Sequence, residues 1–460
     1  MDTKVDVLNL EWRSEPGRDR IISSLVCNYL RYLGFKVQEG SIFKGFELID
    51  KLNPKVLFLS NSIGAPINNA VIKYAASKGI ICISGFSEGN FRENDISQFI
   101  WGHNQDDNFY ESRLLVWSEK KKELALKHFG NQLGEKLAIS GGIGFDLYKI
   151  NEKKNGRDLF LRKYKKAEFE NVIGFGCFDF GIFNPSDTRF ERENRNRPKG
   201  EFLYFLEDRK LLNELLHKLI LSNQKTLFLL KQHPGVELGF WASAIEDLES
   251  FSNVLILKNE ESIYDCIDVS DFWISYESTT ALEAWLLGKQ TCLLNPQGGD
   301  FTRDQIYLGS PIFSTFEEIQ NVIKKFYSTG ELLGFKERTI LRTELIKDTI
   351  QWDDGFNHVR AGNIIVGLLE MDKNSEKSFN LDFQFKFYVF KQRVYSIVIN
   401  IINSYFKIFK KNKRIHMAID LREFNDMRMK AFSEKLFCEQ IDFYSKSNKS
   451  VQDLRCILCM

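Results

Sequence analysis

The sequence predicts an α/β protein in which two doubly wound domains follow one another and a helical tail completes the chain. The first observation is length, because 460 residues exceed the roughly 250–300 that one hydrophobic core serves. The second is an alternation of nearly continuous apolar runs with amphipathic helical runs, which is typical of a parallel sheet covered on both faces. The third is that this alternation occurs twice and then stops. We therefore expect domains at 1–148 and 149–372 that face a cleft, and a tail at 373–460.

The first domain is predicted from short apolar strands separated by helical segments. The first helical segment, 20–33, ends at Gly34, because glycine is favoured just past the end of a helix. The last strand is followed by the glycine-rich segment 141–146, where we expect the connection to the second domain to begin. The expected strands are 5–10, 35–38, 55–60, 80–84, 114–118 and 136–140.

The second domain is predicted from a renewed alternation that starts at residue 171 and includes a long helix at 209–222. In open α/β sheets, ligands bind outside the carboxyl ends of the strands. The polar motifs that follow Leu230 and Ser275 should therefore line the predicted cleft. The expected strands are 171–176, 226–230, 254–257, 272–275 and 291–294.

The segment 274–294 reads as a strand, a hydroxyl-rich turn, a helix and a second strand. Such a turn directs hydroxyls and unpaired backbone N–H groups at one point, which predicts an anion site. Thr280 and Glu283 also have the spacing of a capping box, in which the two residues satisfy each other's backbone donors. Three adjacent hydroxyls exceed what a cap needs, so Ser278, Thr279 and Thr280 are predicted to bind a phosphate. Glu283 could close the cap or bind a ribose hydroxyl.

A second polar motif, Lys231 to Pro234, follows the strand 226–230. The proline restricts the turn and presents His233 at the sheet edge. An imidazole there can donate a charge-assisted hydrogen bond to a phosphate, so His233 is predicted to bind a phosphate and to support catalysis, with Lys231 beside it.

The order of these motifs resembles the carboxyl half of GT-B glycosyltransferases that build bacterial surface carbohydrates. The closest likeness is to the branch that includes CDP-glycerol glycerophosphotransferases and the CMP-sugar enzymes for Kdo and sialic-type acids. The segments that carry the resemblance are 115–119, 139–146, 268–289 and 352–355. In that branch a His-Pro motif and a Ser/Thr pair hold the donor phosphate. The resemblance assigns this role to His233, Pro234, Ser278 and Thr279.

The resemblance implies two Rossmann-like domains, with the nucleotide donor in the second and the acceptor against the first. The implied reaction is transfer of a sugar, from a CMP-sugar in the first instance, to a surface polysaccharide, capsule, lipopolysaccharide or lipid-linked glycan. Polyol-phosphate transfer from a donor such as CDP-glycerol is the alternative within the same class. A nucleotide-sugar epimerase and a non-catalytic assembly scaffold are the alternatives from other classes.

The catalytic base of an inverting transferase must take the proton of the acceptor hydroxyl. Glu88 follows a strand of the first domain and precedes a glycine, which partly matches the acidic residue of the sialic and Kdo enzymes. The glycerophosphotransferases use a histidine instead, for which His103 is the nearest candidate, and Asp95 is a further alternative. The polar residues of the first loop could bind the acceptor or form a surface ion-pair cluster. They are Glu11, Arg13, Arg18 and Asp19.

No metal-ligand cluster is visible in the sequence, and members of this fold generally neutralise the leaving group with helix dipoles and bases. We therefore expect neither a metal nor another cofactor. The arginine-rich segment 186–199 has two interpretations, a solvated insertion or a flap whose arginines meet an anionic ligand.

The tail combines an apolar helical stripe with a basic one between residues 381 and 416. That segment holds eight bases and one acid, a net charge of +7, whereas the whole chain has a net charge of +1. A confined basic surface argues against a nucleic-acid partner and favours an anionic membrane interface. Packing against the core or a partner is the alternative. The start of the sequence has no secretory pattern, so we expect a cytoplasmic protein peripheral to the inner face of the plasma membrane.

Overall fold

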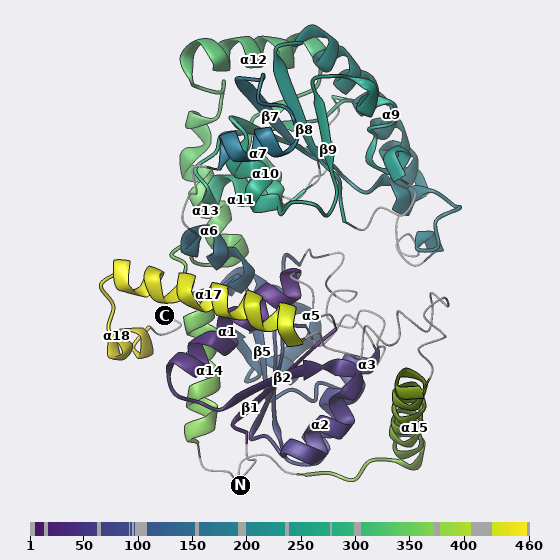
Figure 1. The fold of residues 1–460 in the computed structure, drawn as a ribbon, viewed down its shortest axis with the longest axis vertical. Helices are drawn as coiled ribbons and strands as arrows, with labels where there is room; N and C mark the ends of the chain where they lie inside the picture. Colours follow the sequence, from purple (N-terminus) through teal and green to yellow (C-terminus); the bar gives the residue numbers. More distant parts are fainter. Residues whose placement is uncertain are drawn as a thin grey trace. The chain divides into compact units, whose positions relative to one another are not determined.

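The computed structural model describes residues 5–12, 17–61, 66–91, 93, 96, 108–151, 156–191, 199–234, 239–276, 278–298, 305–371, 378–405 and 426–457. The chain forms two compact units. The first comprises Met1–Ile150 with Lys347–Met460, and the second comprises Asn151–Ile346. Each unit contains a six-stranded sheet in which every pair of neighbouring strands is parallel, with helices packed around it (Figure 1). The predicted class, two doubly wound α/β domains, is confirmed.

The sheet of the first unit has the order β2-β1-β3-β4-β5-β6. Its strands are β1 (Val7–Glu11), β2 (Val37–Ser41), β3 (Val56–Leu59), β4 (Ile81–Ser84), β5 (Arg113–Val116) and β6 (Leu137–Ile139). The inner strands β3, β4 and β5 are buried on both faces, which explains why they are apolar without alternation. The edge strand β2 is polar and partly exposed. Val56 and Phe58 pack into one hydrophobic cluster, whereas Leu57 and Leu59 pack into the cluster on the other face.

Helices cover both faces of this sheet. They include α1 (Arg18–Tyr32), α2 (Gly45–Leu52), α3 (Pro66–Ser77) and α5 (Glu119–Phe129). Ile22, Leu25 and Val26 bring α1 to one face, and Val71 and Ala75 bring α3 to the other.

The sheet of the second unit has the order β12-β11-β10-β7-β8-β9. Its strands are β7 (Asn171–Gly176), β8 (Thr226–Lys231), β9 (Val254–Leu257), β10 (Phe272–Ser275), β11 (Thr291–Leu294) and β12 (Ile312–Phe313). The accompanying helices include α9 (Lys199–Ser222), α10 (Ile263–Val269), α11 (Thr280–Leu286), α12 (Phe316–Thr329) and α13 (Thr339–Ile350). Helices α9 and α12 share one hydrophobic cluster with β7, β8 and β10.

The chain returns to the first unit after Ile346, so the boundary that we expected at residue 372 lies earlier in the structure. Helix α14 (Asn357–Glu370) packs on α1, and a Cβ at Gly362 would lie 2.3 Å from the ring of Tyr29. The two helices therefore approach closely only because residue 362 has no side chain. The Tyr29 hydroxyl also donates to Asn363 Oδ1 at 2.7 Å.

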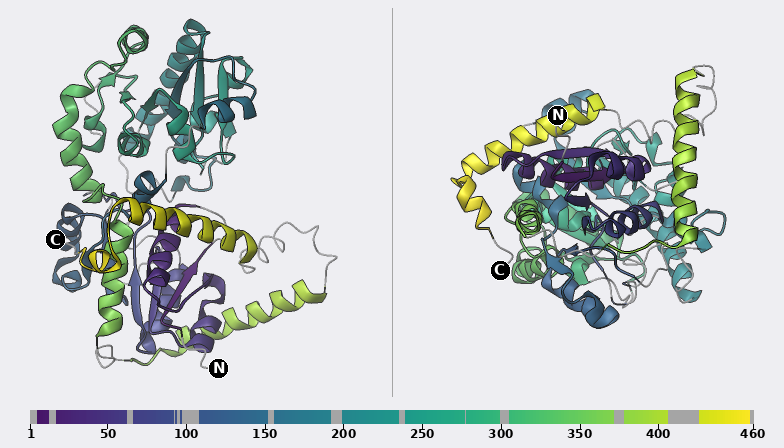
Figure 2. Two further views of the ribbon diagram at one scale, coloured as in Figure 1. Left: turned by 60° about the vertical axis from the view of Figure 1, so that its left-hand side comes forward. Right: turned by 90° about the horizontal axis from the view of Figure 1, so that it is seen from below.

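The described parts of the tail belong to the first unit as well. They are α15 (Phe383–Tyr405), α17 (Asp426–Lys446) and α18 (Val451–Arg455). Helix α17 buries Leu436 against α1, and the Tyr444 hydroxyl lies 2.6 Å from His358 Nε2. Figure 2 shows α15 and α17 on different sides of the first unit. No helix in the described ranges has both the length and the apolar character needed to span a bilayer.

Candidate functional site

The predicted donor-binding residues of the second unit lie at the point where its strand order reverses. From β7 the chain proceeds to β8 and β9 on one side, and then crosses to β10 on the other side. Gly176 of β7 pairs with Lys231 of β8 and with Ser275 of β10. Adjacent strands lie about 4.8 Å apart, so the segments after β8 and β10 leave the sheet at one edge, about 10 Å from each other. Such a switch point is where open α/β sheets bind ligands.

His233 lies at this edge, two residues beyond the end of β8. Its side chain is 48% exposed, and its Nδ1 is 4.0 Å from Asp179 Oδ2. Pro234 next to it is also exposed. Lys231, by contrast, directs its ammonium at the backbone carbonyls of Lys258 and Glu261. The contact of Lys231 with a donor phosphate stays a prediction, and its observed bonds tie β8 to the segment after β9.

Asp179 belongs to a buried ion cluster that the sequence analysis missed. Arg189 donates to Asp179 Oδ2 at 2.6 Å and to both oxygens of Asp187, at 2.9 and 2.7 Å. The Asp187 side chain has no exposed surface, and the Asp179 side chain is 7% exposed. The two carboxylates raise the pKa of Arg189. The guanidinium of Arg189 is thus bound to protein carboxylates, whereas both interpretations of the segment 186–199 placed its arginines in solvent or on a ligand. Residues 192–198 of this segment lie outside the described ranges.

The hydroxyl-rich turn after β10 is held by an indole. Trp273 is fully buried and donates from Nε1 to Thr280 Oγ1 at 3.0 Å. Thr280 also packs over β7, because a Cβ at Gly176 would lie 2.5 Å from Thr280 Oγ1. The expected capping box at Thr280 is wrong, since Thr279 is the N-cap residue and makes no side-chain cap bond. Glu283 is buried in the first turn of α11. With Thr279 as the N-cap, it lies one position beyond N3, the position of the glutamate in a capping box.

Two further described residues of this turn, Tyr276 and Ser278, are also held by hydrogen bonds. The Ser278 hydroxyl accepts a hydrogen bond from the backbone N–H of Thr280 at 3.3 Å. Tyr276 is fully buried and donates to Asp208, whose other carboxylate oxygen accepts from Gln297 at 3.0 Å. The turn that carries Ser278 and Thr279 is therefore anchored on both sides. The phosphate contact of these two residues stays a prediction.

In the first unit, Glu88 lies in the turn after β4 and its side chain is 73% exposed. Arg18, at the start of α1, pairs with it at 3.3 Å, so the structure brings together two residues that were predicted for different roles. The turn is fixed by Trp117, whose Nε1 donates to the carbonyl of Phe86 at 2.8 Å. A Cβ at Gly89 would lie 2.6 Å from the same indole. Asp95, His103 and Arg13 lie outside the described residues.

Glu11 is buried at the carboxyl end of β1, beside the switch point between β1 and β3. It accepts hydrogen bonds from Ser60 N at 3.1 Å, Ser60 Oγ at 2.8 Å and Asn9 Nδ2 at 3.1 Å. Burial, with a smaller contribution from the charge of Asp19, raises its pKa to about 8. Glu11 is therefore not part of a surface ion-pair cluster, which was one of the two roles expected for the first loop.

The segments 352–355 and 141–146, which carried part of the resemblance, build the junction with α14. Arg360 binds both oxygens of Asp354, at 2.8 and 2.6 Å, and stacks 4.0 Å above the Trp352 ring. Asp146 Oδ2 accepts from His358 N at 2.6 Å and lies 2.8 Å from His358 Nδ1. Their role in the structure is to attach the returning chain to the first unit.

No group of three or more potential metal-ligating side chains occurs within the part of the chain that the structure describes. The expected independence from metals stays a prediction.

No protein-family model matches the sequence, and no curated protein matches it. Solved structures do match in fold. One is a protein of Listeria monocytogenes assigned as a UDP-N-acetylglucosamine 2-epimerase, which is 14% identical, with 82% of this chain and 100% of that chain covered and a TM-score of 0.53. Another is MnaA of S. aureus, solved with UDP, which is 11% identical over 82% of this chain and 100% of that chain, with a TM-score of 0.52.

A glycosyltransferase of Rickettsia africae is 14% identical, with 80% of this chain and 100% of that chain covered, at a TM-score of 0.48. Together with the two sheets, the matches to the Listeria and Staphylococcus proteins decide the fold. It is the two-domain GT-B fold.

Proposed function

We propose that this GT-B chain is a glycosyltransferase that moves a sugar from a nucleotide donor to a glycan acceptor. The observation that supports the proposal is that the segment with His233 and the segment with Ser278 and Thr279 leave the second sheet at the same edge, on either side of β7. One imidazole and two hydroxyls can together donate hydrogen bonds to the oxygens of a donor phosphate.

His233 is the side chain that we assign to the leaving phosphate. Its Nδ1 edge faces Asp179, so Nε2 is the nitrogen proposed to donate to a phosphate oxygen. When the bond between the sugar carbon and the phosphate oxygen breaks, negative charge develops on that phosphate. A positioned donor stabilises this charge more in the transition state than in the ground state.

Glu88 is the proposed base, because its exposed carboxylate can receive the proton of an acceptor hydroxyl while the new sugar–oxygen bond forms. Arg18 at 3.3 Å holds the carboxylate in place. Each proton and electron pair is then accounted for: the acceptor oxygen gains the sugar, Glu88 gains the proton, and the nucleotide leaves with the bonding electrons.

For the donor we propose a CMP-sugar, on the resemblance described above, with UDP-sugars as the alternative because MnaA of S. aureus was solved with UDP. For the acceptor we propose a surface polysaccharide or a lipid-linked glycan. The tail between residues 381 and 416 is proposed to attach the enzyme to the inner face of the plasma membrane.

A nucleotide-sugar epimerase is the second candidate. The observation in its favour is that the Listeria and Staphylococcus matches have TM-scores above 0.5, and the Listeria protein is assigned as an epimerase. The difference between the two reactions is the acceptor, because an epimerase converts its nucleotide sugar without one.

A thermal-shift screen with CMP, CDP, UDP and GDP tests the nucleotide, since a ligand that binds only the folded state raises the unfolding temperature. Radiolabelled sugar from the selected donor should then appear in an acceptor glycan with wild-type enzyme. Glu88→Gln should keep nucleotide binding and lose turnover. Isomerised nucleotide sugar formed without any acceptor would establish the epimerase instead, and a chain that binds none of the four nucleotides would overturn both candidates.

A further inference from the structure

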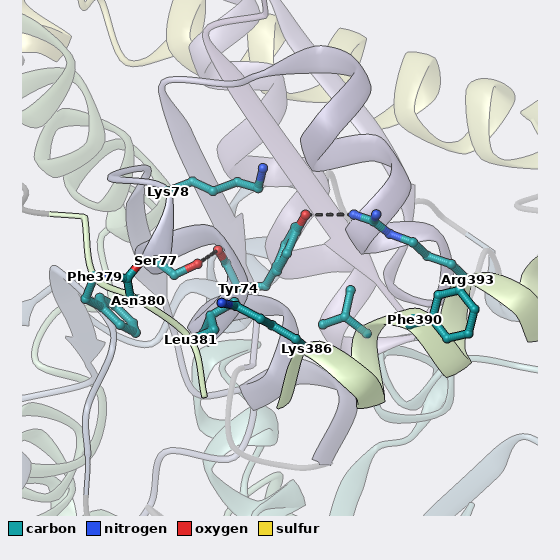
Figure 3. A pocket seen from close by; sticks show the side chains of 10 residues that line it. Tyr74, Ser77, Lys78, Phe379, Asn380, Leu381, Lys386, Phe390 and Arg393 are labelled. Atoms are coloured by element: carbon teal, nitrogen blue, oxygen red, sulfur yellow. Dashed lines mark hydrogen bonds between the residues drawn. The ribbon is translucent and has the colours of Figure 1, made fainter. Parts of the chain in front are cut away.

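A cavity in the first unit is lined by none of the residues assigned above to the proposed reaction. It lies between α3 and the start of the tail, and its volume is about 410 Å³ (Figure 3). Volumes of this size are within the range of small-molecule sites. The lining residues are Tyr74, Ser77, Lys78, Phe379, Asn380, Leu381, Lys386, Val389, Phe390 and Arg393.

The lining of this cavity is cationic. Three of its side chains, Lys78, Lys386 and Arg393, carry a positive charge. Two of these three cations pair with the carboxylate of Asp50: Lys78, at 2.8 Å, and Arg393. Arg393 also donates to the Tyr74 hydroxyl at 2.7 Å, and Figure 3 shows this bond. Lys386 makes no ion pair with any residue that the structure describes.

An apolar stripe runs along α15 beside the cavity. Phe383 is 82% exposed and Phe390 is 59% exposed, and Phe390 also lines the cavity. The exposed members of the stripe recur every three or four residues, as one face of a helix requires. They are Phe383, Phe387, Phe390, Val394, Ile397, Val398 and Ile401.

The opposite face of α15 already has its partner. Val389 is buried against α2 and α3, and Tyr388 packs edge-on against Phe46 with ring centroids 6.3 Å apart. Helix α15 therefore packs on the first unit with one face, the face of Tyr388 and Val389, and exposes its apolar stripe on the other. A contiguous exposed apolar stripe of this kind marks an interaction surface.

We propose that the cavity holds the phosphate of an anionic membrane lipid whose acyl chains lie along the apolar stripe. The inference deepens the proposed membrane attachment of the tail and rests on it. A glycerophospholipid is the ligand whose chemistry matches both features, since it joins a phosphate to apolar chains. Cations beside an apolar helix face are what an anionic bilayer surface attracts. In sequence, α15 is followed by five further bases, which lie outside the described residues: Lys407, Lys410, Lys411, Lys413 and Arg414.

Two lysines of α15 provide a matched pair of variants. Lys386 lines the cavity, whereas Lys391 is exposed on the same helix and lies over the ring of Phe387, outside the cavity. A lysine near an anionic surface contributes about fivefold to partitioning at low salt, and salt screens this contribution. A lysine that contacts a seated phosphate contributes about tenfold or more and is screened less.

The experiment is co-sedimentation of the full chain with phosphatidylcholine vesicles, with and without phosphatidylglycerol, at low and at raised salt. We expect the wild type to prefer the anionic vesicles. At raised salt, Lys391→Ala should match the wild type, and Lys386→Ala should bind the anionic vesicles about tenfold more weakly. Both substitutions are on exposed side chains, so the unfolding temperature should not change.

The outcomes separate the cavity from the attachment. Equal losses for the two variants at both salt concentrations would leave membrane attachment in place and overturn the lipid site. A wild-type chain that co-sediments with neither kind of vesicle would overturn both the membrane attachment and the lipid site. Displacement of the chain from anionic vesicles by soluble glycerol phosphate would show a free-phosphate site and overturn the assignment to a lipid. Nucleotide binding in the same variants should stay unchanged, which separates all of these results from the transferase proposal.

Discussion

Glu11→Gln tests the charge state of the buried carboxyl at the switch point of the first sheet. The pKa of this carboxyl is about 8 in the folded chain, against an ordinary value of 4.5. A raised folded pKa means that the folded state binds the proton more tightly than the unfolded state does. The resulting stabilisation is complete below pH 4.5 and is lost as the pH rises through about 8.

The magnitude follows from the shift. At about 1.4 kcal/mol for each pKa unit, a shift from 4.5 to about 8 changes the free energy of unfolding by about 5 kcal/mol between pH values below 4.5 and above 8. Between pH 6 and pH 8 the free energy of unfolding of the first unit should fall by about 2 kcal/mol through Glu11 alone. Glutamine cannot titrate but can keep the bonds with Ser60, by accepting from its N–H and donating to its hydroxyl. The variant should therefore lack this part of the pH dependence.

The assay is urea-dependent hydrogen exchange of the peptide that contains β1, at pH 6 and at pH 8, for wild type and variant. Exchange of β1 amides reports opening of the first unit. Between pH 6 and pH 8, we expect the free energy of unfolding of the wild type to fall by about 2 kcal/mol more than that of Glu11→Gln. Glu88→Gln is the matched control, because Glu88 is exposed, and it should follow the wild type. Parallel pH profiles for wild type and Glu11→Gln would refute the reasoning.

Three further predictions concern positions where the structure shows what each side chain contacts. His233→Ala should weaken nucleotide binding about tenfold by calorimetry, whereas His217→Ala, on α9 and stacked edge-on against Phe251, should not. Gly176→Ala places a methyl 2.5 Å from Thr280 Oγ1 and should lower both the unfolding temperature and nucleotide affinity, while Gly367→Ala, with nothing within 4 Å, should lower neither. Arg360→Lys loses the two-bond contact with Asp354 and should cost ~1–2 kcal/mol in urea unfolding.

The sequence was sufficient for the two sheets because their signal is local. In the second sheet, the expected strands at 171–176, 254–257, 272–275 and 291–294 coincide with β7, β9, β10 and β11. Strands buried on both faces must be apolar at every position, so each can be found without knowing its neighbours. The strand order that creates the switch points depends on pairing between distant segments, which the local pattern does not contain.

The turn chemistry was only partly predictable, because side chains at a sheet edge compete for the same groups. Thr280 and Glu283 have the spacing of a capping box. In the structure Trp273 takes the Thr280 hydroxyl, since the glycines of β7 leave room for the indole. The competing bond comes from a residue seven positions away and from packing on another strand, so no local motif could reveal it.

The return of the chain to the first unit was missed for a similar reason. The segment 352–355 resembles a family motif, and in the structure its Asp354 and Trp352 both contact Arg360 of α14. A helix such as α14 has the same amphipathic pattern whether it covers one sheet or the other. Only contacts such as Gly362 with Tyr29 decide which sheet it joins.

Both switch points carry a buried carboxyl group, and the two are compensated in opposite ways. Asp179 follows β7 and is bound by the guanidinium of Arg189, so its charge has a cationic partner and it can orient His233. Glu11 ends β1 and, among the described residues, receives hydrogen bonds from the neutral donors of Ser60 and Asn9, so burial favours its protonated form. A carboxyl that keeps its proton near pH 7 can donate a hydrogen bond as well as accept one. The second unit thus has a carboxylate beside His233 at its switch point, and the first unit has a buried carboxyl that can share its proton with the Ser60 hydroxyl.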